Sequence, residues 1–190
     1  MPRGPSSLLL AVLVLILIAA CGGVSPAPQP NPAPLSTSPR LEAPSVVAPR
    51  DGSMYVGRPC AALTSSELTR LGMRPQGRQR TNNGVQECDW SSGELENLAI
   101  YVDPGRDLLA DTYRTWRGVL VPITVEGMPA ALQKIGRGEF NTCTVTTGLG
   151  PKQAIETTWI GKGDPRPGND ACEFAEQATA LVIRKLPPQR

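Results

Sequence analysis

The most informative absence from this 190-residue chain is histidine, of which it has none. Histidine is the commonest general base near neutral pH and the commonest metal ligand. Its absence excludes a Ser-His-Asp or Cys-His mechanism built from this chain alone. The sequence also lacks a nucleophile elbow, a P-loop, an H-E-x-x-H motif and a dinucleotide fingerprint. We therefore expect a protein that is not an enzyme, with no catalytic, metal-binding or cofactor-binding residues and no cofactor.

A charge excess of either sign is also missing. Lysine and arginine number 19 and aspartate and glutamate 17, so the net charge is +2. A dedicated nucleic-acid-binding protein carries a large basic excess, because it must neutralise phosphates. Nucleic acid is therefore excluded as an expected partner.

Residues 1–20 are predicted to be a signal peptide. A continuous apolar run from Leu8 to Ala20 follows a weakly positive start that contains Arg3. As a helix this run would span roughly 20 Å, which is short of the roughly 30 Å hydrocarbon core of a bilayer. That length is typical of the apolar region of a signal peptide. A short membrane-spanning anchor is the alternative.

The end of the apolar run, Ile18–Cys21, resembles the bacterial lipobox: a branched apolar residue, two small residues and a cysteine. The resemblance implies that the Cys21 thiol receives diacylglycerol. It also implies cleavage before Cys21 and acylation of the new N-terminus, with palmitate as an expected acyl chain. Two acyl chains are enough for stable anchoring. We therefore expect the protein to be lipid-anchored to the cell membrane and to face the extracytoplasmic side.

Residues 21–54 are predicted to be the lipidated cysteine and a disordered tether. Proline supplies eight of the 29 residues from Gly22 to Arg50, and no aromatic residue occurs among them. Proline removes backbone donors and favours the extended polyproline II conformation, so this stretch cannot form a packed core. A spacer is a better interpretation than a docking motif.

Lipidation of Cys21 would leave four cysteines: Cys60, Cys88, Cys143 and Cys172. In an oxidising compartment, four thiols most simply form two disulfides. Three pairings are possible, and we favour Cys60 with Cys172 and Cys88 with Cys143. A redox or metal site is the alternative, but the chain contains no C-x-x-C motif.

Residues 55–190 are predicted to form one small α+β domain, with a mostly antiparallel sheet flanked by N- and C-terminal helices. Thr64 and Glu67 have the spacing of a capping box, and Gly72 would end this first helix. Asp170 would cap the last helix, which would end near Leu186. Strands are expected over residues 86–91, 98–102, 119–125, 140–147 and 154–160.

A middle helix is expected to begin at Asp103, with Pro104 in its first turn. It would place Leu109, Tyr113 and Trp116 on one stripe. Residues 127–129 would then break the chain, because they combine glycine and proline.

Few residues outside the cysteines suggest chemistry. Asp103, Asp107 and Asp111 are spaced to share a helix face, where they would form either a cation or acid–base site or, as we favour, a solvated acidic face. Trp90 and Trp116 are expected to pack in the core, and a binding edge is the alternative for Trp116. The glycine- and proline-rich loop over residues 161–169 is the segment in which we expect a partner contact.

Four ordered motifs carry a resemblance to a known family: Pro59-Cys60-x-x-Leu63-Thr64-x-x-Glu67, Cys88-x-Trp90, Cys143-x-Val145 and Asp170-x-Cys172-Glu173-x-Ala175. Together with the lipobox and the tether, they resemble the actinobacterial envelope lipoproteins of the Lpr type, built on domain of unknown function 3558. The chain departs mildly at Ala171, where the pattern expects proline. The resemblance implies an exported, membrane-tethered domain without an assigned activity.

Three functions fit these features. We favour a non-catalytic domain that binds a small ligand, a lipid or an envelope protein. The second is a structural or sensory subunit of an envelope complex. The third, which the lack of histidine disfavours, is a carboxylate-based cell-wall hydrolase, which would need two carboxylates facing each other across a cleft. Neither the partner nor the oligomeric state follows from the sequence.

Overall fold

A computed structural model describes residues 42–93, 96–136, 140–162 and 170–190. These residues form a seven-stranded antiparallel sheet with three α-helices and two short 3-10 helices, which confirms the predicted α+β class. The strand order is β1-β2-β3-β7-β6-β5-β4. The strands are β1 (Arg78–Asn82), β2 (Val85–Ser91), β3 (Asn97–Asp103), β4 (Val119–Val125), β5 (Met128–Lys134), β6 (Phe140–Gly150) and β7 (Gln153–Lys162).

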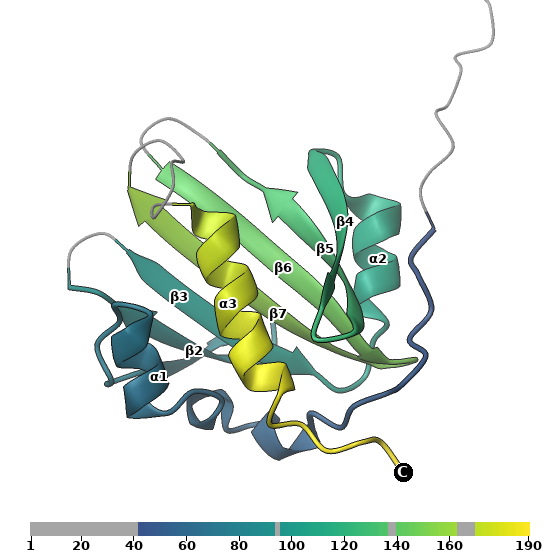
Figure 1. Cartoon of the computed structure of the whole chain (residues 1–190), viewed down its shortest axis with the longest axis horizontal. Helices are drawn as coiled ribbons and strands as arrows, with labels where there is room; N and C mark the ends of the chain where they lie inside the picture. Colours follow the sequence, from purple (N-terminus) through teal and green to yellow (C-terminus); the bar gives the residue numbers. More distant parts are fainter. Residues whose placement is uncertain (1–41, 94–95, 137–139, 163–169) are drawn as a thin grey trace, which may run out of the picture. The chain divides into compact units, whose positions relative to one another are not determined.

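One face of the sheet carries the main core. Because successive side chains of a strand point to opposite faces, the core residues of a strand recur at every second position. Cys88 pairs in register with Ile100, and Cys143 pairs with Trp159, all on this face. Helix α3 (Ala171–Ile183) crosses this face over β6 and β7 (Figure 1).

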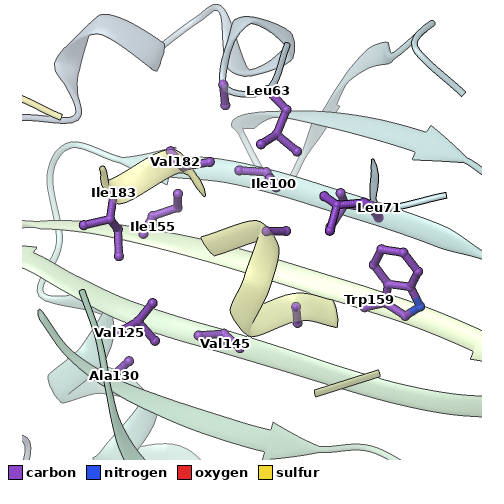
Figure 2. Close-up of a cluster of buried hydrophobic side chains, with 14 of the residues drawn as sticks. Leu63, Leu71, Ile100, Val125, Ala130, Val145, Ile155, Trp159, Val182 and Ile183 are labelled. Atoms are coloured by element: carbon purple, nitrogen blue, oxygen red, sulfur yellow. The ribbon is translucent and has the colours of Figure 1, made fainter. Parts of the chain in front are cut away.

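Helix α3 is held by its apolar side chains. Val182 and Ile183 are almost fully buried and belong to the same cluster as Ile155 of β7 (Figure 2). Near the other end of the helix, the ring of Phe174 stacks on Trp159 with the ring centroids 4.5 Å apart. Trp90 is also buried in this cluster, as predicted.

Helix α1 (Ser65–Arg70) has the predicted capping box. The Thr64 hydroxyl accepts a hydrogen bond from the Glu67 amide, and the Glu67 carboxylate accepts one from the Thr64 amide. Lys185, which follows α3, donates to the same carboxylate at 2.7 Å and to the Ala62 carbonyl at 2.6 Å. These contacts tie the first helix to the end of the last one.

The middle helix, α2 (Leu108–Thr115), begins later than predicted and packs on the other face of the sheet. Its N-cap is Asp107, which accepts a hydrogen bond from the Ala110 amide. The predicted cap, Asp103, instead closes a turn before the helix by accepting from the amides of Gly105 and Arg106. The Asp-Pro signal was therefore a turn signal, and the helix start was wrong by one turn.

The buried stripe of α2 is shorter than predicted. Leu109 and Tyr113 form a small cluster with Ala131 of β5. Trp116 is the C-terminal cap in an extended conformation, so its side chain leaves the stripe and is only half-buried. Its indole nitrogen donates to the Val119 carbonyl. The expectation that Trp116 packs in the core was therefore wrong.

Both disulfides form, but the favoured pairing was wrong. The bonds are Cys60–Cys88 and Cys143–Cys172, with Cα atoms 5.0 and 4.9 Å apart. Cys88 and Cys143 share a sheet face, but β3 and β7 lie between their strands. Three strand spacings are about 14 Å, about twice the largest Cα separation that a disulfide can bridge. Each bond instead joins the sheet to the layer above it: to the 3-10 helix η2 (Pro59–Ala61) or to α3.

Strands β1 and β5 were not predicted. The sequence of β1 is entirely polar and exposed at the sheet edge, so it has no alternation to detect. The start of β5 was mistaken for a chain break because Gly127, Met128 and Pro129 combine turn residues with apolar ones. Gly127 has a φ of 77° in the turn, and β5 begins directly after it. Pro122 lies on the edge strand β4, where its missing amide hydrogen does the least harm to the sheet.

Residues before Tyr55 also take part in the fold. The Arg50 amide donates to the Leu149 carbonyl, and Arg50 forms a β-bridge with Pro188. The Gly52 amide donates to the Gln153 side chain at 2.8 Å. The folded unit therefore includes part of the stretch that composition assigns to the tether. Among the described residues, no helix is long and apolar enough to cross a membrane.

Candidate ligand-binding cleft

Several predicted positions lie outside the part of the chain that the structure describes. These are Cys21 with the rest of the lipobox, and residues 163–169 of the predicted contact loop. The three aspartates do not share a helix face, because Asp103 ends β3, Asp107 caps α2 and only Asp111 lies within the helix. They therefore do not form the suggested site.

A polar cleft lies on the sheet face opposite α3, over β1, β2, β3 and β7. Its volume is about 390 Å³. We define the polar cleft by six of its lining residues: Arg80, Glu87, Tyr101, Arg106, Glu156 and Thr158. Five of these six side chains stand on adjacent strands, and Arg106 follows β3.

Strand register brings four of these residues into one row. Arg80 pairs with Glu87, Glu87 with Tyr101, and Tyr101 with Glu156. Directly paired side chains on one face have Cβ atoms about 5 Å apart. The row therefore places two carboxylates on either side of a phenol, with a guanidinium at one end.

Glu156 is held by the hydroxyl groups of Tyr101 and Thr146. Thr146 of β6 shares its single hydroxyl proton between Glu156 Oε2, at 3.2 Å, and Gln133 Oε1, at 2.9 Å. Burial raises the pKa of Glu156 above its usual range, and the charge of Glu87 adds to this effect. Burial also raises the pKa of Tyr101, as does the neighbouring Glu156, so the phenol stays protonated and can donate.

Arg80 lies between two buried carboxylates of β2. Its Nε is 2.5 Å from Glu87 Oε1 and 2.5 Å from Asp89 Oδ2, and each carboxylate side chain is only 6% exposed. Burial raises the pKa of Asp89, with Arg80 opposing this and Glu87 reinforcing it. Among the described residues, none donates a conventional hydrogen bond to either Asp89 oxygen or to Glu87 Oε1. The two acids thus share the Arg80 guanidinium, with Arg78 also opposing the rise in the pKa of Asp89, and both retain accepting capacity.

Arg106 is fixed at another side of the cleft by Asp103. Its Nε donates to Asp103 Oδ2 at 2.7 Å, and a terminal nitrogen lies 2.5 Å from the same oxygen. Burial alone would raise the pKa of Asp103, but hydrogen bonds from the Gly105 amide and from Arg106 outweigh it and lower the pKa. The guanidinium is therefore held in place beside the cleft.

A second, larger cleft lies where the first described residues meet α2. This tether-side cleft has a volume of about 660 Å³ and is lined by Ala43, Val46, Leu109 and Tyr113, among others. The Tyr113 hydroxyl is buried and has no hydrogen-bond partner among the described residues. Burial raises the pKa of this phenol. Aliphatic side chains and proline are more prominent here than in the polar cleft.

Sequence reasoning missed Glu87, Tyr101 and Glu156. In the sequence, these residues are the polar members of strands in which polar and apolar residues alternate. Such polar positions are ordinarily interpreted as a solvent-facing surface. Only the register shows that these residues form one row, and only the structure shows that Glu87 is 5% exposed. Strand alternation can place residues on a face, but it cannot identify their cross-strand neighbours.

The arrangement can donate and accept hydrogen bonds at several fixed points. Glu87 and Glu156 line the same cleft, as the hydrolase alternative requires, but both rise from one sheet face with the strand of Tyr101 between them. Two strand spacings put their Cα atoms about 10 Å apart. Among the described residues, no group of three or more acidic or cysteine side chains is placed to hold a metal ion.

Comparison with known proteins gives one match. A family model described as protein of unknown function DUF3558 matches residues 16–185, which is most of the chain. No curated protein matches the sequence, and no solved structure matches the fold.

Proposed function

The chain belongs to the DUF3558 family of proteins of unknown function, and on this premise we propose that it is an exported, lipid-anchored protein whose folded domain binds a ligand in the polar cleft. The domain would hold the ligand without transforming it. The membrane would be reached through lipidated Cys21, with the folded domain on the extracytoplasmic side.

Export and anchoring are supported by two independent features. The first is the lipobox resemblance at Ile18–Cys21, directly after an apolar run of signal-peptide length. The second is the presence of two disulfides in the folded unit, since such bonds persist in oxidising compartments outside the cytoplasm. The remaining cysteine is the one that the lipobox would modify.

Binding is supported by one observation above the others: Glu87 of the charged row and its neighbour Asp89 are buried carboxylates that are not fully hydrogen-bonded. Burying charged groups in a sheet costs stability unless each is well paired. Here Glu87 and Asp89 share Arg80, and Arg78 also acts on Asp89. Oxygens of both acids still have no conventional hydrogen-bond donor among the described residues. Buried, imperfectly satisfied charges are concentrated at functional sites. Of the two acids, Glu87 lines the polar cleft, where a ligand with polar hydrogens would bond its carboxylate.

Binding is favoured over catalysis for a chemical reason. Glu87 and Glu156 rise from one sheet face with β3 between them, so they do not face each other across a cleft as a carboxylate-based hydrolase requires. The chain also supplies no histidine that could transfer protons near neutral pH.

Anchoring is tested by replacing Cys21 with alanine in cells of the source organism. We expect loss of incorporated alkyne-labelled palmitate, retention of the uncleaved signal peptide and loss of the mature membrane-bound form. Ser25→Ala is the matched control, because it changes a nearby small residue and leaves the lipobox intact. A Cys21→Ala protein that is still labelled and processed would contradict the proposal.

Binding in the cleft is tested by ligand-observed NMR of the full chain against a chemically mixed library of sugars, amino acids, polyamines, nucleosides and fatty acids. We expect at least one class to bind and to lose affinity in Glu156→Gln. Glu42→Gln, on the wall of the tether-side cleft, is the matched control. Binding that responds only to Glu42→Gln, or no binding by any class, would refute this site.

A further inference from the structure

We propose that the ligand of the polar cleft is a neutral saccharide of one or two rings. The inference rests on the proposed function and adds the chemical class of the ligand. It is carried by the balance of charges in the cleft, by the mixture of donors and acceptors that line it, and by how firmly each of these groups is held.

The charges around the polar cleft are nearly balanced within the fold. Arg106 is paired with Asp103. Arg80 is paired with Glu87 and Asp89, and Arg78 also acts on Asp89. Among these groups Glu156 is the one acid in excess, and it accepts hydrogen bonds from neutral hydroxyl groups. A site for a polyamine or a phosphate would carry an excess of the opposite sign, because a buried ligand charge must be compensated. The balance therefore favours a ligand that is polar and uncharged.

Donors and acceptors alternate along the cleft. The guanidinium groups of Arg80 and Arg106 only donate, whereas the ionised carboxylates only accept. The amide side chain of Asn97, which also lines the cleft, does both. A hydroxyl group donates and accepts at once, so a ligand with many hydroxyls satisfies both kinds of neighbour. Saccharides have this property together with apolar C–H faces, for which Ala99 and Ile160 provide contact surface.

The polar groups are held before any ligand arrives. Arg80 is fixed by Glu87 and Asp89, Arg106 by Asp103, and Glu156 by Thr146 and Tyr101. All but Arg106 stand on paired strands. Fixed groups lose little conformational entropy on binding, which matters for a ligand whose hydrogen bonds replace bonds to water.

Size and polarity separate this site from the other cleft. At about 390 Å³ the polar cleft lies at the lower end of the range of about 300–1,000 Å³ for small-molecule sites. A cleft of about 390 Å³ suits one or two sugar rings. An acyl chain would bury its apolar surface better in the tether-side cleft, against Leu109 and Val46. A lipid is therefore not the expected occupant of the polar cleft.

The test uses the full chain in a zwitterionic detergent that has no sugar headgroup. Saturation-transfer NMR is recorded with neutral disaccharides of glucose, mannose, galactose and N-acetylglucosamine. The charged probes are a glucosamine disaccharide, a galacturonate disaccharide and spermidine. We expect at least one neutral disaccharide to bind with a dissociation constant no weaker than about 1 mM, and the charged probes to bind at least about tenfold more weakly.

Two tyrosine variants locate the binding. Tyr101→Phe removes the hydroxyl that fixes Glu156, and we expect it to weaken disaccharide binding about tenfold. Tyr113→Phe removes a buried hydroxyl from the tether-side cleft and is expected to change the affinity less than about twofold. If Tyr101→Phe is unfolded by circular dichroism, Thr158→Val and Glu156→Gln take its place, because each changes one cleft group with little change in volume.

Three results would overturn the saccharide proposal. The first is that no neutral disaccharide binds at 10 mM, about ten times the weakest affinity expected. The second is that a charged probe binds more tightly than every neutral one. The third is that Tyr113→Phe weakens binding as much as Tyr101→Phe. The second result, if sensitive to Glu156→Gln, would leave the ligand-binding function standing and refute only the ligand class.

Discussion

The disulfide pairing can be tested by removing cysteines two at a time. The bonds Cys60–Cys88 and Cys143–Cys172 close sequence separations of 28 and 29 residues. If this pairing holds, replacing both members of one pair by alanine leaves the other bond intact. Replacing Cys60 and Cys172 together instead removes one member of each bond, so Cys88 and Cys143 are left as two free thiols.

The size of the effect follows from loop closure. A bond that closes about 29 residues lowers the free energy of the folded relative to the unfolded state by about 3.6 kcal/mol. Because the two loops are nearly equal, the two correct double variants should lose similar stability before packing differences are added. For a folded unit of this size, each kcal/mol lowers the melting temperature by about 2–4 °C. We therefore expect a fall of about 7–14 °C for each variant.

Free thiols in the denatured, unreduced protein are counted with a thiol reagent, and the melting temperature is measured by thermal unfolding. In a Cys21→Ala background, so that no unmodified Cys21 thiol is counted, the variant lacking Cys60 and Cys88 should show no free thiol. The variant lacking Cys60 and Cys172 should show two. The opposite pattern would refute the fold's register, since it requires Cys88 to meet Cys143 across β3 and β7.

Two further predictions concern the sheet and its covering helix. Glu156→Gln should raise the free energy of unfolding at pH 7 by about 1 kcal/mol, because it removes a buried charge and keeps a group that Tyr101 and Thr146 can bond. The pKa of Glu156 is higher in the folded than in the unfolded protein, so protonation of Glu156 stabilises the fold. This stabilisation is complete below the unfolded pKa of about 4.3 and is lost as the pH rises through the folded pKa. The gain of the variant over wild type in urea titrations should therefore shrink towards pH 4, and an equal gain at both pH values would contradict the assignment. Ile183→Ala should cost about 2–5 kcal/mol in the same assay, because the side chain is 1% exposed in the main core. Ile135→Ala, at 37% exposure, should cost less than about 1 kcal/mol, and equal losses would show that α3 is not packed as described.

The sequence was most informative where local chemistry decides the structure. The capping box at Thr64 and Glu67 involves groups three residues apart, so the pattern alone predicts the first helix start. The strand predicted over residues 140–147 likewise lies within β6, because its residues alternate in polarity. An aspartate before a proline can either close a turn or cap a helix, and the local pattern does not distinguish these roles. Asp103 closes a turn.

Most of the candidate site could not be predicted from the sequence, because it depends on the order of the strands in the sheet. Glu87 and Glu156 are almost seventy residues apart, and each looks like an ordinary polar residue on the outer half of a strand. They become neighbours in one row only because β3 pairs with both β2 and β7. The disulfide pairing failed for the same reason, since it also needed the strand order.

The most direct test of the account is the place at which a ligand perturbs the folded domain. Amide chemical shifts of the isotope-labelled full chain would be recorded while a neutral disaccharide is added. We predict that the largest changes fall on Tyr101, Glu156 and Thr158, in the polar cleft. Changes that centre instead on Leu109 and Tyr113, or no change at saturating sugar, would contradict the polar cleft as a saccharide site.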